Sequence, residues 1–222
     1  MFYQPVLEAR WFKPGIRYSQ INWSNFSTVV SEFDGRLREW YLNPARCLQC
    51  NSGHYAFSVM ALACLLTDTL SQFHSGRLES SKTTFVAFVR QQFPEFSQTL
   101  MNPIQRPPGS RPPPQITDYA EALYHGFRCG ILHEAHIAVY GAIAGQDTVV
   151  KCQADGVTRY HGGGDCPTVI IDPKRFLELL DGFLVTYVSQ LLDPNAAYDP
   201  LRNAFKSKFN SSFGIDITSS AL

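Results

Sequence analysis

The spacing of hydrophobic residues predicts a chain made mainly of amphipathic helices. Apolar side chains recur every three and four positions after Ser24 or Asn25, and Asn43-Pro44 is expected to end that first helix. A loop over 44–53 should follow. The next helix, from about residue 54 to 73, is apolar on nearly all sides, with Gly76 as its stop signal. Such a helix is expected at the buried centre of the domain.

Three further helices follow from the same reasoning. Ser80 or Ser81 should cap a helix with a phenylalanine-rich face that closes at Pro94, and Thr117 should cap one that runs to about Val139. Asp172, with Pro173 in the first turn, predicts a last long helix. A shorter helix is expected near 197–209.

The remaining segments predict connectors and a small β insertion. Residues 1–20 are aromatic and indicate a short strand or an ordered arm, whereas residues 102–115 hold six prolines and predict an extended, non-helical connector. Residues 148–171 alternate apolar and polar around Asp155-Gly156, which predicts a β-hairpin or three short strands between the fourth and fifth long helices. A frayed tail over 210–222 completes a single, mainly α domain.

Composition and charge narrow the function classes. The chain has 222 residues, 19 basic and 19 acidic side chains, and 45% hydrophobic residues, so it can bury a large core and carries no global positive field for nucleic acid. The longest mostly apolar run, residues 55–66, is too short to span a bilayer, and the N-terminus lacks a signal-peptide pattern. We therefore expect a cytoplasmic protein without a membrane partner. Phosphate-cradle motifs are absent, so no cofactor is expected.

The segment 119–141 carries the most chemical information. On an α-helical wheel one face is apolar, and the other holds Arg128, Glu121 and three of the six histidines of the chain. Arg128 and His133 lie about 140° apart on this wheel. Gly130 lies beside the apolar face and should allow another backbone to approach closely. This face could simply be solvated, with Arg128 in a salt bridge to Glu121.

The run Phe127-Arg-Cys-Gly-Ile-Leu-His-Glu-Ala135 resembles the signature helix of the HEPN superfamily, in which an arginine is followed, after four to six residues, by a histidine. The apolar helix and the phenylalanine-rich helix before it fit this resemblance, which spans roughly residues 54–138. It implies an antiparallel HEPN-like helical bundle that dimerises and cleaves RNA without a metal ion, as a toxin or antiviral defence effector. An antitoxin or a defence-system protein is then a possible partner.

The resemblance assigns chemical roles that fit the residue types. Arg128 would stabilise charge on the phosphate, and His133 would act as general acid or base on the RNA 2′-hydroxyl. Because the wheel separates the two side chains, two copies of the helix should meet across a homodimer interface. Glu121, His136 and Asp68 are candidate supporting residues. Many active members have a polar residue after the motif arginine where this chain has Cys129, so a non-catalytic RNA- or protein-binding module is the alternative.

A second candidate site is Cys47-x2-Cys50, whose spacing is typical of metal or redox sites. A structural zinc ion needs four ligands, and the others could come from His54 or from the β insertion at Cys152, His161 and Cys166. No second such pair is present, so zinc is a weak candidate and an adaptor organised by a metal is the third alternative.

Overall fold

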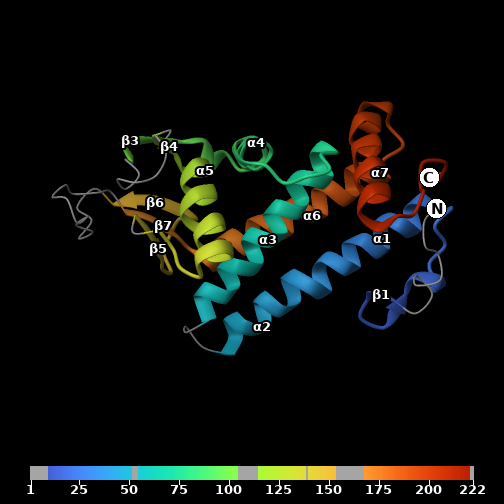
Figure 1. The fold of residues 1–222 in the computed structure, drawn as a ribbon, viewed down its shortest axis with the longest axis horizontal. Coiled ribbons are helices and arrows are strands. Elements are labelled where there is room, and N and C mark those ends of the chain that lie inside the picture. The colour runs from blue at the N-terminus through green and yellow to red at the C-terminus, as the bar shows by residue number, and fades with distance from the viewer. Residues whose placement is uncertain (1–9, 52–54, 105–114, 139, 154–167, 221–222) are drawn as a thin grey trace.

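The computed structural model describes residues 10–51, 55–104, 115–138, 140–153 and 168–220, and it confirms a mainly helical protein (Figure 1). Helix α3 (Ala56–Ser75) lies at the centre and packs against α2 (Asn43–Asn51), α4 (Lys82–Gln92), α6 (Pro173–Leu192) and α7 (Asp199–Phe213). Gly76, with a φ of 70°, ends α3 as expected.

Side-chain caps fix several helix starts where the sequence predicted them. The Asn25 side chain accepts a hydrogen bond from the Thr28 N–H at the start of α1 (Phe26–Leu37). Ser81 caps α4 in the same way, and Asp172 accepts from two N–H groups at the start of α6. The predicted cap at Thr117 is wrong: Thr117 lies in a strand, and Asp118 caps the helix that follows by accepting from the Glu121 N–H.

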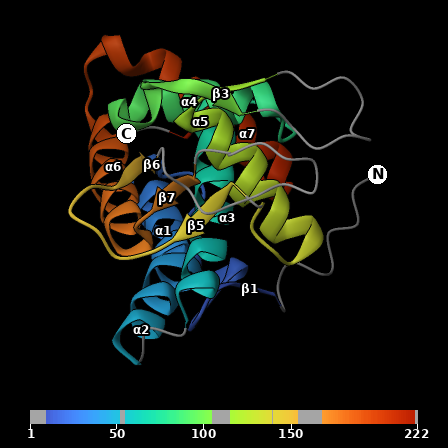
Figure 2. The ribbon, with the colours of Figure 1, turned by 90° about the vertical axis from the view of Figure 1, so that its left-hand side faces the viewer.

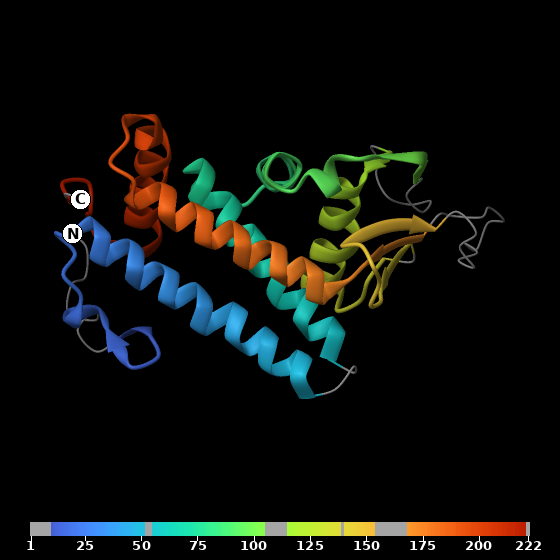
Figure 3. The same ribbon diagram turned by 180° about the vertical axis from the view of Figure 1, so that it is seen from behind.

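The first helix does not end at Asn43-Pro44. After α1 the chain continues through a π-helical segment, Arg38–Leu42, directly into α2, so the expected loop over 44–53 is helical as far as Asn51. Hydrogen bonds in a π-helix reach back five residues, and this shift falls where Pro44 has no N–H to donate. The segments α1, Arg38–Leu42 and α2 thus form one continuous helical rod, and this rod lies beside α6 (Figure 3).

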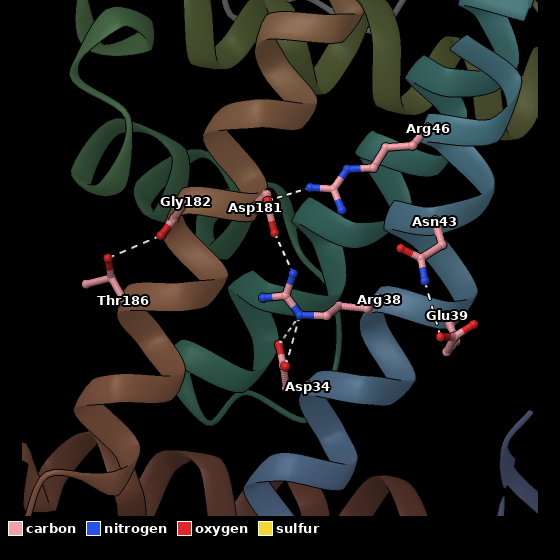
Figure 4. Close-up of polar contacts among 8 residues, drawn as sticks. All are labelled: Asp34, Arg38, Glu39, Asn43, Arg46, Asp181, Gly182 and Thr186. Carbon is pink, nitrogen blue, oxygen red and sulfur yellow. Dashed lines mark hydrogen bonds and ion pairs between the residues drawn. The ribbon is translucent and has the colours of Figure 1, made fainter. Parts of the chain in front are cut away.

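An ion-pair cluster joins this rod to α6 (Figure 4). Arg38 donates to Asp34 on its own helix at 2.9 Å and to Asp181 of α6 at 2.7 Å, while Arg46 reaches the other oxygen of Asp181. Two guanidinium groups thus contact one carboxylate of α6 and one of their own helical segment, and the cluster is electrically balanced.

The core is rich in aromatic side chains. Phe33 of α1, Phe73 of α3 and Phe205 of α7 contact one another, with ring centroids 4.4–5.6 Å apart. Each is at most 3% exposed. Such rings combine a large buried apolar area with favourable edge and offset geometry, so they hold α1, α3 and α7 in one core.

The β structure is larger than the predicted insertion. Strands β6 (Val150–Gln153) and β7 (Thr168–Ile171) pair antiparallel, as expected of a hairpin, but β5 (Gly141–Ile143) adds to β7 in parallel, so the sheet begins before residue 148 (Figure 2). Within the proline-rich connector, residues 102–104 belong to β3 (Thr99–Ile104), which pairs with β4 (Ile116–Asp118). The rest of the connector, residues 105–114, lies outside the described residues.

Both chain ends contribute structure where the chain is described. β1 (Trp11–Lys13) and β2 (Ile16–Arg17) form an ordered arm. The prediction of a frayed tail is wrong, because α7 extends to Phe213 and the following segment folds back. Ile217 is fully buried, and the Ser220 hydroxyl donates to the Trp23 carbonyl at 2.7 Å.

Helix α3 is long and apolar enough to cross a membrane by length and composition alone. In this fold 56% of its most apolar window is buried among the other helices. Buried polar residues, including Thr67 and Asp68, lie along the same helix. The features of α3 are those of a core helix.

Candidate active site

The helix that carries Arg128 and His133 is π-helical. After one turn of α-helix, α5 (Tyr119–Ala122), the chain forms a π-helix over Leu123–Glu134. Ala135 ends it with a φ of 53°, and its N–H bonds to the carbonyl of Gly130, five residues earlier. The helix therefore stops short of Val139, which itself lies outside the described residues.

The π-helix brings Arg128 and His133 together within one chain. Nη1 of Arg128 lies 3.2 Å from Nε2 of His133. The expected separation of about 140° assumed α-helical geometry, whereas hydrogen bonds from residue i to i+5 return residue i+5 toward residue i. The geometric reason for needing two copies to unite these side chains is therefore wrong.

Asp68 of α3 holds the guanidinium from the other side. Its Oδ2 accepts from Nη2 of Arg128 at 3.0 Å, and both side chains are only 13% exposed. The hydroxyl of Ser80 bridges the pair, because it donates to the other carboxylate oxygen of Asp68 and accepts from the same Nη2 at 3.3 Å. The arginine is thus fixed by an ion pair and a hydroxyl behind it, and His133 is exposed in front.

Neighbouring aromatic and sulfur groups complete the surroundings of Arg128. The Tyr124 ring lies under the guanidinium, whose carbon is 5.5 Å from the ring centroid. Burial raises the pKa of Tyr124, and Cys129, which hydrogen-bonds to it, acts in the same direction. Cys129, the residue after the motif arginine, thus interacts with a tyrosine five positions earlier.

The electrostatics keep Arg128 charged. Burial alone lowers the pKa of this guanidinium, but the hydrogen bond and the charge of Asp68 outweigh burial and raise it. The Arg128 Nη1–H donates to the imidazole only where Nε2 carries a lone pair. The arrangement is a fixed cation beside an exposed nitrogen that can accept a proton.

Glu121 and His136 are not brought to Arg128. The Glu121 carboxylate accepts from the Thr117 N–H at 3.1 Å and pairs with Lys82 at 3.1 Å. His136 lies beyond the helix end, exposed, with Nδ1 3.3 Å from Glu134. Of the three supporting candidates, only Asp68 contacts Arg128.

Gly130 has the role that the sequence suggested. A Cβ atom at this position would lie 2.5 Å from the carbonyl oxygen of His136, so the returning backbone passes directly over the glycine. The N–H of Ala138 also bonds to the carbonyl of Gly126 at 2.9 Å. These contacts close the end of the π-helix next to His133.

The Cys47 and Cys50 side chains are exposed on α2. Over the residues that the structure describes, no group of three or more histidine, cysteine, aspartate or glutamate side chains is placed to hold a metal ion. The other suggested ligands His54, His161 and Cys166 lie outside those residues, and Cys152 is half-buried in β6.

Sequence reasoning missed Ser80 and Tyr124 as neighbours of Arg128. Ser80 was considered only as an alternative cap to Ser81. Once Ser81 caps α4, the neighbouring Ser80 hydroxyl is available for another partner, and this could have identified Ser80 from the sequence. Tyr124 precedes Arg128 by four residues in the sequence, and its ring is half-buried.

No protein-family profile, curated protein or solved structure matches this chain.

Proposed function

We propose that this protein is a metal-independent endoribonuclease of HEPN type. The observation that carries the proposal is the 3.2 Å contact between Arg128 Nη1 and His133 Nε2, with the arginine anchored by Asp68. A guanidinium can stabilise charge on the phosphate and an imidazole can act as general base or acid, and these two roles suffice for RNA cleavage through the 2′-hydroxyl. The helical arrangement around them is, in this proposal, a variant of the HEPN-like bundle.

The proposed reaction uses His133 as the base and Arg128 as the phosphate ligand. His133 takes the proton of the 2′-hydroxyl while the 2′-oxygen bonds to phosphorus, and the bond to the 5′-oxygen breaks. A 2′,3′-cyclic phosphate and a free 5′-hydroxyl result, with the proton on the departing oxygen supplied by imidazolium or water. Arg128 Nη1 donates to a non-bridging oxygen as negative charge develops there.

Asp68 and Ser80 are positioning residues in this mechanism. An arginine on a flexible stem loses side-chain entropy when it is fixed, and here the ion pair fixes it before substrate arrives. Because Nη2 is held by Asp68 and Ser80, Nη1 is the part of the guanidinium directed to His133.

We further propose that the protein acts as a cytoplasmic homodimer, serving as a toxin or antiviral effector and held in check by an antitoxin or defence-system partner. Each chain supplies its own Arg128 and His133, so a second copy would double the site.

A non-catalytic RNA- or protein-binding module is the second candidate. It is favoured by the Asp68 carboxylate, which neutralises Arg128, and by Cys129 in place of the usual polar residue. In that case RNA would bind without being cut.

Cleavage of a labelled RNA in EDTA tests the proposal, with Arg128→Lys, His133→Ala and the matched control His136→Ala. His136 is also an exposed histidine at the end of the same helix, but it contacts Glu134 and not Arg128. We expect the first two variants to lose at least a hundredfold in rate, and His136→Ala to keep wild-type activity. Cyclic phosphate ends should accumulate.

Three outcomes would contradict the proposal. Activity that survives both substitutions would place the chemistry elsewhere. Activity lost in EDTA and restored by a divalent ion would favour a metal site. RNA that binds in an Arg128-dependent way but stays intact, with wild-type folding, would favour the binding module.

A further inference from the structure

A groove lies between the end of α4 and the outward face of α6, next to the loop before β6. Its volume is about 710 Å³, and Phe93, Val149, Leu179 and Phe183 form its apolar floor. The side of the molecule that carries α6 is seen in Figure 3. None of its lining residues belongs to the Arg128 site, so it requires a separate explanation.

The α6 side of the groove has the spacing of a helix-packing surface. Lining residues run from Arg175 through Glu178 and Gly182 to Thr186, which is the i, i+3, i+7, i+11 pattern of one helical face. Eleven residues of helix span about 16 Å. A second helix laid along this face would therefore contact three turns of α6.

No contact among the described residues explains why position 182 is a glycine. It lies in the interior of a 20-residue helix, where glycine costs about 0.5–1 kcal/mol relative to alanine. A Cβ atom there would meet nothing within 4 Å, so no contact of the described fold requires its absence. Figure 4 shows its neighbour Asp181 directed to Arg38 and Arg46. A missing side chain on the groove face lets another backbone come close.

The rim of the groove is acidic. Glu95, Asp147 and Glu178 are exposed and line it, and among the described residues none of them makes an ion pair. The one basic residue of the lining, Arg175, donates from Nε to the Gln146 carbonyl at 2.8 Å and lies 4.0 Å from Asp172. The rim therefore presents uncompensated negative charge around an apolar floor.

We infer that this groove binds a basic amphipathic helix of a partner protein. Its apolar side would lie on the floor with its backbone over Gly182, and lysine or arginine side chains on its flanks would pair with Glu95, Asp147 and Glu178. This is helix-in-groove recognition with charge complementarity. The inference does not depend on the proposed ribonuclease activity.

The test uses a defined probe. A fluorescent 14-residue helical peptide with leucines on one face and lysines on both flanks is titrated onto the full chain, beside a peptide with glutamates in place of the lysines. Backbone NMR shifts locate the site. The Glu95→Lys/Glu178→Lys double variant removes the charge match. Gly182→Leu adds a side chain at a groove-lining position where a Cβ atom meets nothing within 4 Å, and thermal unfolding checks both folds.

We expect the lysine peptide to shift residues of α6 and the end of α4, and each variant to weaken it at least tenfold at an unchanged or higher Tm. Raising the salt concentration should weaken it as well. Equal binding of the glutamate peptide, binding that Gly182→Leu leaves intact, or no binding at millimolar peptide would overturn the inference. Displacement of the peptide by low micromolar spermidine would assign the groove to a small polycation instead.

Discussion

Replacing Asp68 by Asn should remove the counter-ion of Arg128, whose guanidinium is already largely buried. Removing one partner of a fully buried ion pair costs about 3–5 kcal/mol. Here 13% of each side chain is still exposed, and Ser80 retains a hydrogen bond to the guanidinium. We therefore expect a smaller loss, about 2–3 kcal/mol in the free energy of unfolding, which lies at or below the lower limit of that range. Arg128→Gln should cost a similar amount, because it strands the carboxylate.

The double variant Asp68→Asn/Arg128→Gln measures how much of each single loss in stability comes from the ion pair itself. Two neutral amides in the same place can hydrogen-bond to each other and leave no stranded charge. The double variant should therefore lose at least about 1 kcal/mol less than the sum of the single losses. Urea unfolding at pH 7 measures all four proteins. Single losses below about 0.5 kcal/mol, or additive losses, would refute the ion-pair geometry on which the site depends.

Other positions give predictions that urea unfolding also checks. Gly130→Ala should lower the free energy of unfolding by about 1–3 kcal/mol, because its Cβ would lie 2.5 Å from a backbone oxygen. Gly182→Ala should raise the free energy of unfolding by about 0.5–1 kcal/mol, because its Cβ meets nothing within 4 Å. Equal effects of the two substitutions would contradict this contrast. Burial opposes ionisation of Glu121, but hydrogen bonds from Thr117 and the Lys82 charge lower its pKa overall. Glu121→Gln should therefore lose stability at pH 7, and the difference from wild type should disappear as pH falls below the ordinary pKa of glutamate. Burial lowers the pKa of His74 among three aromatic rings. Wild type should therefore lose stability from pH 7 to pH 5, and His74→Phe should lose less.

Local chemistry made much of the fold predictable. The cap at Asp172 and the stop at Gly76 are confirmed, and the caps at Asn25 and Ser81 are each one of the two neighbouring residues that were predicted. Each depends on a side chain or backbone conformation within a few residues. The start of the helix after β4 was missed by one residue, at Asp118. Helix ends are the positions where neighbouring polar side chains compete for the same N–H groups.

The π-helical segments could not be predicted from periodicity. An apolar pattern with intervals of three and four fits an α-helix of 3.6 residues per turn. That period places the His133 imidazole away from Arg128, whereas at Asn43-Pro44 a local stop signal predicts the end of a helix that in fact continues. Long-range packing decides between α and π hydrogen bonding, and a local sequence pattern carries no information about that packing.

Part of the candidate site was nevertheless visible in the sequence. A lone acid in an apolar helix needs a partner when buried, which singled out Asp68, and Arg128 is that partner. Glu121, the salt-bridge partner that the helical wheel offered for Arg128, pairs with Lys82 instead. Charge type alone does not choose between two carboxylates, because the choice depends on which helix packs beside the arginine.

The position of His133 follows from the backbone around it. A π-helix has poorer hydrogen-bond geometry than an α-helix, and Ala135 adds a left-handed conformation that costs about 1–2 kcal/mol in a residue with a Cβ. The returning segment offsets this through the bonds from His136 to Gly130 and from Ala138 to Gly126. Both acceptors are glycines four residues apart, which is where the returning backbone needs room. The contacts that stabilise the unusual helix therefore follow directly after His133, at the end of the helix where its imidazole meets Arg128.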